Sequence, residues 1–488
     1  MHMNRREALE KLGAGFGMVG LANMLGQHFQ AEAASIGPNS QTPSLEPKQP
    51  HFAPKAKQVI FLFLNGGPSQ VDTFDPKPSL AKYHGQPIPG DYPKAKAERG
   101  TLMQSPFKFQ RYGQSGLEVS ELFEKTAQCI DDICVIRSMH TDLPAHPQAI
   151  LQMNNGRIIP GFPSMGSWIT YGLGTENRNL PGFISLCAGV PDVGPQLWGS
   201  AFLPSIYQGT YVPVDESDPE KMIQHLRSQS GGSAADQRAR VDLWEQLNRL
   251  DLSRRGPDAQ LEGRIQSMEV AYRMQAEAMD AFDVAKEPEA VRARYGVPAS
   301  KDLTEMKIKS ATRDGDFARG CLVTRRLIER GVRVVQLYFG NDKPWDSHHD
   351  ILVHRKLALQ ADQPIAALLQ DLKASGLLKE TLVIIGGEFG RRPWTEVAGR
   401  INVQNGRNHN NEGFTYLLAG GGVKGGMAYG ATDEFGYQSV ENKVHVHDLH
   451  ATVLHLMGLE HTRLTFPYSG RNFRLTDVAG NVVKQIVA

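Results

Sequence analysis

Short apolar runs that end in polar residues constrain this fold most strongly. The first run covers residues 58–64 (QVIFLFL) and ends at Asn65-Gly66-Gly67-Pro68-Ser69. A strand that is apolar at consecutive positions must be covered on both faces, which is typical of a parallel strand inside a sheet. Similar runs recur at residues 133–136, 332–339, 381–385 and 415–418.

Helical patterns lie between these runs, for example at residues 357–372 and 449–457. Strands that alternate with helices predict an α/β fold with a central, mainly parallel sheet. Residues 216–295 differ from the rest, since they are rich in Glu, Gln, Arg, Ala and Met and poor in strand formers. They predict a helical insertion of two or three long helices.

The N-terminus has the features of a targeting signal. Arg5 and Arg6 precede a glycine-rich apolar stretch at residues 12–26, and small residues follow at 31–34. This order is typical of a signal peptide, and adjacent arginines favour the twin-arginine route. The alternative is an amphipathic helix of a cytoplasmic protein. We expect a signal peptide at residues 1–34, a linker at 35–56, a folded domain at 57–488 and a periplasmic or secreted protein.

Composition excludes several classes of protein. Lys and Arg total 53 and Asp and Glu total 52, so the net charge is +1 and no basic excess indicates nucleic-acid binding. The apolar stretch near the N-terminus is shorter than the roughly 20 residues of a membrane span, so we expect none after signal removal. The four cysteines form no CxxC pair and are interpreted as small buried hydrophobes, with a Cys129–Cys134 bridge as the alternative.

Polar residues that follow the predicted strands carry the chemistry, because ligands of an open parallel sheet bind beyond the carboxyl ends of its strands. The strongest cluster is residues 346–350 (DSHHD). Asp346 and His348 face the same way on an extended segment and could chelate one ion, with His409 arriving from a later loop. Carboxylate and imidazole together suit zinc, manganese or iron. The alternative is an exposed polar loop.

Other strand-end residues have two interpretations each. Glu388 could be a ligand or a helix cap, and Arg391 could clamp an anionic ester or serve as a surface charge. His140 and His146, six residues apart, are each interpreted as structural histidines. The histidines of residues 445–461 are also interpreted as structural.

Six stretches from Phe63 to Gly436 together resemble one exported bacterial family of unknown function, DUF1501. They are FLNGGPSQVDTFDPKP, RSMHTDLPAHPQAILQMNNG, FPSMGSWITYGLG, PWDSHHD, TLVIIGGEFGRRP and GRNHNNEGFTYLLAGGGVKGGMAYGATDEFG. That family is grouped with the alkaline phosphatase and sulfatase superfamily. The resemblance implies an alkaline phosphatase-like three-layer sandwich with a metal centre at the carboxyl edge of its sheet.

The resemblance also assigns individual positions. Asn65 stands where the superfamily has an Asp ligand, and Asp72 is a substitute metal ligand. Thr141 is similar to the nucleophile position of phosphodiesterase-like members. Glu388-Phe389 stands for a later Asp-His pair, so one histidine ligand is missing.

The remaining positions imply one retained metal site. Asp346-x-His348 stands for an Asp-x-x-x-His pair, and His409 for the final histidine. The implied activity is exported, metal-dependent hydrolysis of small-molecule or polysaccharide phosphate or sulfate esters, with zinc or manganese as the ion. Glu388 would be a base and Arg391 would neutralise charge on the ester. The alternative is a degenerate member that binds a glycan or cell-envelope ligand.

Overall fold

The structure is a computed structural model that describes residues 43–488 apart from residues 99, 223–233, 256–257, 298–314 and 399–400. The expected signal peptide and the first part of the expected linker lie outside the described residues. Residues 43–56 run without helix or strand to the first strand of the sheet.

Within the described residues, a nine-stranded sheet forms the centre of the molecule. Its strands pair in the parallel sense except where β11 meets its two neighbours. The order is β12 (Met427–Tyr429), β4 (Ile133–His140), β11 (Phe414–Ala419), β8 (Thr381–Gly386), β1 (Gln58–Phe63), β7 (Val334–Tyr338), β5 (Phe183–Cys187) and β6 (Thr210–Pro213), with β15 (Val444–His445) also beside β4.

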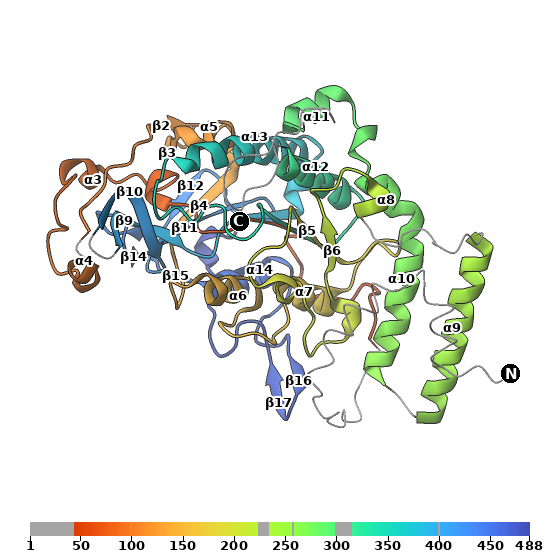
Figure 1. Cartoon of the computed structure of the whole chain (residues 1–488). Helices are drawn as coiled ribbons and strands as arrows, with labels where there is room; N and C mark the ends of the chain where they lie inside the picture. The colour runs from red at the N-terminus through yellow and green to blue at the C-terminus, as the bar shows by residue number, and fades with distance from the viewer. Residues whose placement is uncertain (1–42, 99, 223–233, 256–257, 298–314, 399–400) are drawn as a thin grey trace.

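Helices cover both faces of this sheet and make three layers (Figure 1). Ile60 and Leu62 of β1 join the core beneath α12 (Asp316–Glu329) and α13 (Val353–Ala374). The alternate residues Phe61 and Phe63 join the core on the other face, under α6 (His146–Asn155), α7 (Met165–Leu173) and α14 (Val446–Leu456). A strand with large apolar side chains on both faces therefore sits in the middle of the sheet, and the predicted α/β class with a mainly parallel sheet is confirmed.

One predicted strand runs in the opposite sense. β11 was expected to be parallel because it is apolar on both faces, but it pairs antiparallel with β4 and β8. The cause is the connection from β8, which is the hairpin of β9 (Gly390–Ala398) and β10 (Ile401–Asn410). This hairpin leaves the chain at the carboxyl edge of β8, so β11 starts there and runs back.

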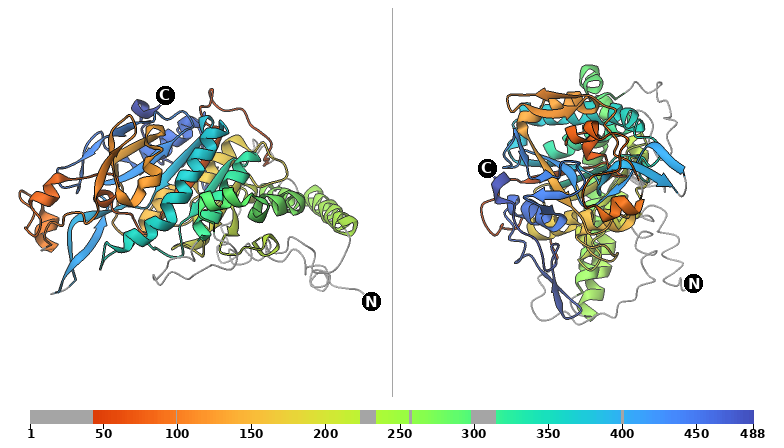
Figure 2. Two further views of the ribbon diagram at one scale, coloured as in Figure 1. Left: turned by 90° about the horizontal axis from the view of Figure 1, so that it is seen from above. Right: turned by 90° about the vertical axis from the view of Figure 1, so that its left-hand side faces the viewer.

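Residues 216–295, interpreted as helical, contain α8 (Pro219–Met222), α9 (Ala234–Arg255), α10 (Ala259–Phe282) and α11 (Glu289–Tyr295). The hairpin of α9 and α10 projects from the body, and α9 is its outermost helix in Figure 1 and in the left view of Figure 2. Smaller elements are α3 (Pro78–Lys82), α4 (Pro93–Glu98), α5 (Glu124–Ala127) and the strand pairs β2–β3 (Phe109–Tyr112, Leu117–Ser120), β13–β14 (Ala431–Thr432, Ser439–Glu441) and β16–β17 (Phe466–Tyr468, Arg471–Phe473).

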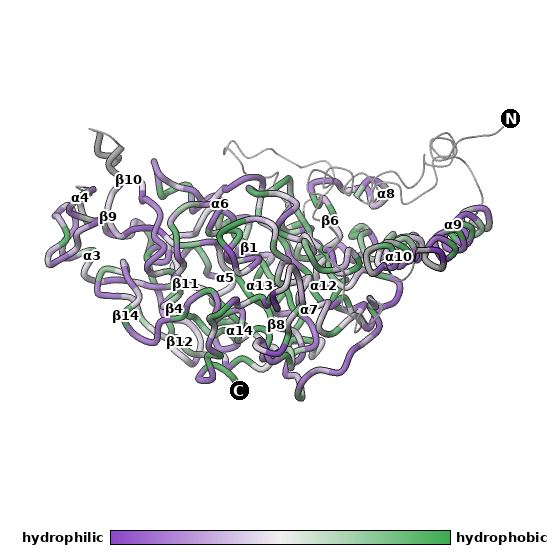
Figure 3. The backbone as a smooth tube through the Cα atoms, turned by 90° about the horizontal axis from the view of Figure 1, so that it is seen from below, coloured by the Kyte–Doolittle hydropathy of each residue, from purple (hydrophilic) through white to green (hydrophobic). Residues whose placement is uncertain are grey.

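The structure also bears on the predictions for the cysteines and for membrane-spanning helices. The four cysteines are buried and free, so the alternative of a Cys129–Cys134 bridge is not what the structure has. Among the described helices, none combines the length and the apolar character that crossing a membrane requires. Figure 3 shows that the hydrophobic stretches concentrate in the sheet and in the helices packed on it.

The central strand should carry much of the stability. We expect Leu62→Ala to lower the free energy of unfolding by about 2–5 kcal/mol, because Leu62 is fully buried and the truncation leaves a cavity. Leu359→Ala, on the exposed side of α13, should change it by less than about 0.5 kcal/mol. Chemical denaturation of both variants tests this. Equal costs would contradict the position assigned to β1.

Candidate metal centre

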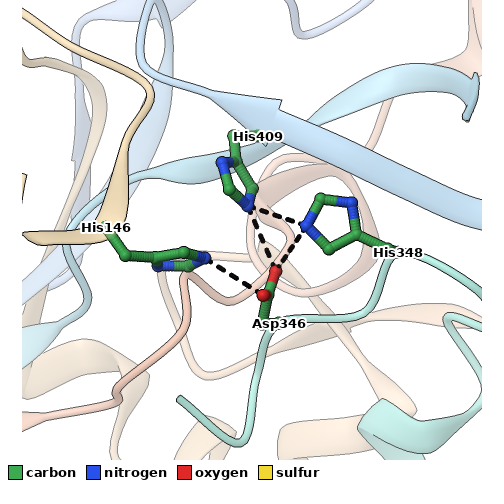
Figure 4. Close-up of side chains that lie close together, drawn as sticks. All are labelled: His146, Asp346, His348 and His409. Atoms are coloured by element: carbon green, nitrogen blue, oxygen red, sulfur yellow. Dashed lines mark hydrogen bonds and ion pairs between the residues drawn. The ribbon is translucent and has the colours of Figure 1, made fainter. Parts of the chain in front are cut away.

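Four side chains that can hold a metal ion meet at the carboxyl edge of the sheet. Asp346 and His348 follow β7, His146 opens α6, and His409 lies on β10 (Figure 4). One ligand atom from each residue lies within 4.8 Å of all the others. Among the described residues, these four side chains form the one group of three or more potential ligands that lie this close together.

The distances show three imidazoles around one carboxylate. His348 Nε2 and His409 Nε2 lie 2.8 and 3.2 Å from Asp346 Oδ1, and His146 Nε2 lies 3.2 Å from Asp346 Oδ2. The two nitrogens of His348 and His409 are themselves only 2.8 Å apart. All three rings therefore point their Nε2 atoms at one small volume.

The other ring nitrogen of each histidine is already committed to an acceptor. His409 Nδ1 donates to the carbonyl oxygen of Pro144 at 2.7 Å. His348 Nδ1 lies 2.5 Å from the carboxylate of Glu396, and His146 Nδ1 lies 2.5 Å from that of Glu388. Carbonyl and carboxylate oxygens accept hydrogen bonds, so each Nδ1 carries a proton, and the neutral form of such a ring has its lone pair on Nε2.

This arrangement fits a divalent cation. Without a cation or extra protons, the lone pairs of His348 and His409 would face each other at 2.8 Å. The buried Nε2 of His146 also has no hydrogen-bond partner. Histidine held through Nδ1 by a carboxylate or carbonyl is the usual environment of a metal-ligating imidazole.

Electrostatics prepare the ligands for this role. Burial opposes the ionisation of Asp346, but its contacts with the three histidines and the charge of Arg391 hold its pKa well below the usual range. Burial lowers the pKa of His409 to about 4, so this ring is neutral near pH 7. Burial also acts to lower the pKa of His146, but the nearby carboxylates of Asp346 and Glu388 outweigh burial and raise that pKa, so a bound cation would have to displace a proton from this ring.

His146 is the residue that sequence reasoning missed. It was interpreted as structural, yet it is the first residue of α6 and joins the cluster. Its ring packs on Phe389, with centroids 4.7 Å apart, and Phe389 packs on His409 at 4.6 Å. Phe389 thus forms an apolar wall beside His146 and His409. The available signal was the position of His146 just beyond a predicted strand.

Two glycines hold the loop that carries Asp346 and His348. A Cβ on Gly66 would lie 2.6 Å from the Asp346 backbone nitrogen, and a Cβ on Gly406 would overlap the His348 carbonyl group. Backbone hydrogen bonds join the same parts, from Trp345 to the carbonyl oxygen of Asn65 and from Arg407 to that of Ser347. The loop is therefore held between the end of β1 and strand β10.

Glu388 and Arg391 lie directly behind the four-residue cluster. Glu388 is fully buried and accepts hydrogen bonds from the Gly66 backbone nitrogen at 2.9 and 3.1 Å while it holds His146. Arg391 is also fully buried. Its Nη2 donates to Asp346 Oδ1 at 2.7 Å and its other contacts are backbone carbonyls, so the guanidinium is committed within the protein.

Asp72 and Thr141 lie outside the cluster. Both oxygens of Asp72 are engaged by Arg407, at 2.8 and 3.2 Å, and both side chains are fully buried. Arg407 belongs to β10 and lies two residues before His409, so this ion pair anchors the strand that carries His409. The Thr141 hydroxyl donates to Gln152 Oε1 at 2.5 Å and is nearly buried. Of the predicted metal ligands, the structure brings Asp346, His348 and His409 together, and His146 joins them. Asp72 and Thr141 are not part of this cluster.

The later histidines have backbone partners. His445 caps α14, accepting from the His447 backbone nitrogen, and its Nε2 lies 3.0 Å from Asp142. Nε2 atoms of His447 and His450 each lie 2.8 Å from a backbone carbonyl oxygen. These contacts agree with the structural interpretation of residues 445–461.

We expect Gly406→Ala to weaken metal binding and to lower the free energy of unfolding by about 1–3 kcal/mol, because the added methyl displaces the His348 loop. Gly199→Ala is the matched control, since a Cβ there meets its neighbours no closer than 3.4 Å. Metal titration and thermal unfolding measure both effects. The assignment fails if both variants behave alike.

A second variant addresses the contacts behind the cluster. Glu396→Ala should reduce metal affinity about 10- to 100-fold, because His348 loses the acceptor that fixes its tautomer. Glu434→Ala changes an exposed acidic side chain whose hydrogen-bond partner is Ser79, and it should leave the affinity unchanged. Competition with a fluorescent chelator gives both affinities.

A family model described as "Protein of unknown function (DUF1501)" matches residues 56–487. The chain belongs to this family, and the resemblance noted from its motifs is confirmed. No curated protein sequence matches the chain.

Solved structures show only distant similarity. The PsFucS1 sulfatase from Pseudoalteromonas sp. is 11% identical, with 83% of this chain and 68% of that chain covered and a TM-score of 0.34. The lipoteichoic acid synthase LtaP from Listeria monocytogenes is 8% identical, with 91% and 78% covered and a TM-score of 0.34. The alkaline phosphatase from the Antarctic bacterium TAB5 is 10% identical, with 83% and 99% covered and a TM-score of 0.31. Scores this low carry no information on the chemistry of the site.

Proposed function

We propose that this DUF1501 member binds one divalent metal ion through His146, Asp346, His348 and His409 and hydrolyses phosphate or sulfate esters of small molecules or polysaccharides. The observation that carries the proposal is the convergence of three Nε2 lone pairs on one ionised carboxylate, with every Nδ1 already committed. Imidazole with carboxylate favours zinc or manganese as the ion.

A divalent ion supplies Lewis acidity toward an ester oxygen and toward water when it is bound. The residues of the chain control how an ester reaches it. Asp346, His348 and His409 keep between 16 and 25% of their side-chain surface exposed, whereas His146 is almost buried. An ester therefore approaches from the side of the three partly exposed ligands, and Phe389 excludes water behind His146 and His409.

The structure changes the roles we propose for three other residues. Arg391 helps to keep Asp346 ionised from behind, and it is not available to an ester because its side chain is fully buried and hydrogen-bonds to Asp346 and to backbone carbonyls. Glu388 orients His146, since its carboxylate already accepts from the ring and from Gly66. Thr141 receives no role as nucleophile, because its hydroxyl is bound to Gln152 outside the cluster.

One observation favours a second candidate. The chain itself offers four ligand atoms, and four protein ligands can close a tetrahedral zinc site, as structural zinc sites do. The protein would then be a binding protein with a structural ion, in line with the alternative of a glycan or cell-envelope ligand.

Both candidates include export by the twin-arginine route, which the paired Arg5 and Arg6 support.

Metal content tests the shared part of both candidates. We expect about one equivalent of zinc or manganese in the purified protein and loss of it in His348→Ala, which removes one of four ligands. His349→Ala is the matched control, because His349 is the exposed neighbour of His348 and lies outside the cluster. Mass spectrometry of the intact holoprotein and elemental analysis give the stoichiometry. Metal-free wild-type protein after reconstitution would contradict the site.

Coordination and turnover separate the two candidates. For a hydrolase, X-ray absorption should show one or two light ligands beyond the four protein donors, and aryl phosphate, phosphodiester or aryl sulfate should be cleaved only by metal-loaded protein. Chelation should abolish turnover and re-addition of metal should restore it. A four-coordinate centre without turnover on any of these esters would support the structural ion instead.

A further inference from the structure

Helix α9 carries an exposed apolar face on the outside of the projecting hairpin. Leu243, Leu247 and Leu250 are 51, 49 and 55% exposed. Their spacing of four and then three residues places them on one side of the helix. Val241 of the same helix is buried, so α9 has one apolar contact toward α10 and a second apolar stripe that faces away from it.

The inner side of α9 is already used. Arg238 forms ion pairs with Glu269 of α10 at 2.9 Å and with Asp242 of its own helix. Val241, Trp244 and Ile265 line the seam between the two helices. No described element lies outside α9 in the views of Figures 1 and 2. Figure 3 shows hydrophobic residues along this outermost helix among hydrophilic ones.

Charged residues extend the stripe in both directions with the same spacing. Asp236 and Arg240 precede the leucines, and Arg254 follows them, so that positions 236, 240, 243, 247, 250 and 254 alternate by four and three residues. This spacing is typical of the seam of a short coiled coil, here with charged ends and an apolar centre. Asp251 lies beside the seam at its C-terminal end.

For a pair formed by two copies of α9, the charge order favours one orientation. In a parallel pair of α9 helices, Asp236 would face Asp236 and Arg240 would face Arg240 of the second copy. In an antiparallel pair, Leu243 of one copy meets Leu247 of the other, and Asp236 then meets Arg254. Arg240 lies over Leu250, where its aliphatic stem packs and its head group comes near Asp251.

We propose that the outer face of α9 is a homodimer interface, in which two copies of this chain pair through antiparallel α9 helices around a two-fold axis. The same face meets itself, as a two-fold interface requires. Asp236, Arg240 and Asp251 also have contacts within their own chain, so the ion pairs between copies add to them. The proposal does not depend on the proposed function.

The overall shape permits this contact. β9 and β10, which bear part of the metal centre, lie at the opposite end of the molecule from α9 (Figure 1). Two bodies joined by their hairpin tips would therefore keep both centres open. A contact through one helix from each copy is at the small end of stable interfaces, so we expect dissociation in the micromolar range.

Sedimentation velocity of the full chain across a range of concentrations tests the dimer. Wild type should pass from monomer to dimer, and Leu247→Glu should weaken dimerisation at least about tenfold because it places a carboxylate in the apolar seam. Leu359→Glu, at another exposed leucine on α13, is the control and should dimerise as wild type does. Unchanged far-UV circular dichroism shows that each variant is folded.

Charge exchange tests the orientation. Asp236→Arg alone and Arg254→Asp alone each place like charges together and should weaken the dimer. The double variant Asp236→Arg/Arg254→Asp restores opposite charges only in the antiparallel arrangement, so it should recover wild-type dimerisation. A monomeric wild type at all concentrations, or dimerisation that is unaffected by Leu247→Glu, would overturn the proposal. Failure of the double variant to recover would overturn the antiparallel arrangement.

Discussion

Three imidazole nitrogens with their lone pairs on the same side, close to one ionised carboxylate, form an arrangement that needs positive charge to be stable. The protons that could have supplied it are held on the Nδ1 atoms by Glu388, Glu396 and the Pro144 carbonyl. The site is thus ordered by contacts made outside it. Pro144 lies far along the chain from Glu388 and Glu396, so the tautomers depend on the assembled sheet edge.

The surrounding structure serves that convergence. Gly66 and Gly406 let two backbone segments approach the loop of Asp346 and His348 closely. The Asp72–Arg407 ion pair lies beneath β10, where it holds the strand that carries His409. A buried ion pair contributes little net stability compared with apolar packing, but removal of one partner is strongly destabilising. The role of the Asp72–Arg407 ion pair is therefore to fix the position of β10.

Much of the fold could be predicted from residue patterns. Apolar runs located β1, β4, β7, β8 and β11, because a strand covered on both faces has to be apolar throughout. The direction of β11 could not be predicted, since it depends on where the β9–β10 hairpin returns the chain. Apolarity reports burial and carries no information on direction.

The site was predictable to the extent that it is local. Asp346 and His348 lie two residues apart in an extended loop, so their spacing alone suggested a shared ion. His146 has no such neighbour in sequence, and its role follows from Glu388 and Asp346, which the fold brings to it. Asp72 has the chemistry of a ligand and follows the first predicted strand, but the structure pairs it with Arg407 outside the cluster, and that pairing spans more than half of the chain.

The four ligands come from three segments that lie far apart along the chain. In the unfolded chain, bringing such segments together has a large loop-closure entropy, so the unfolded protein has little means of retaining an ion. We therefore expect capture of the proposed ion to follow assembly of the sheet. This differs from small zinc domains, in which metal binding and folding are one step. The proposed ion would then be acquired in the compartment where folding is completed, and the metal available there would decide which ion the site receives.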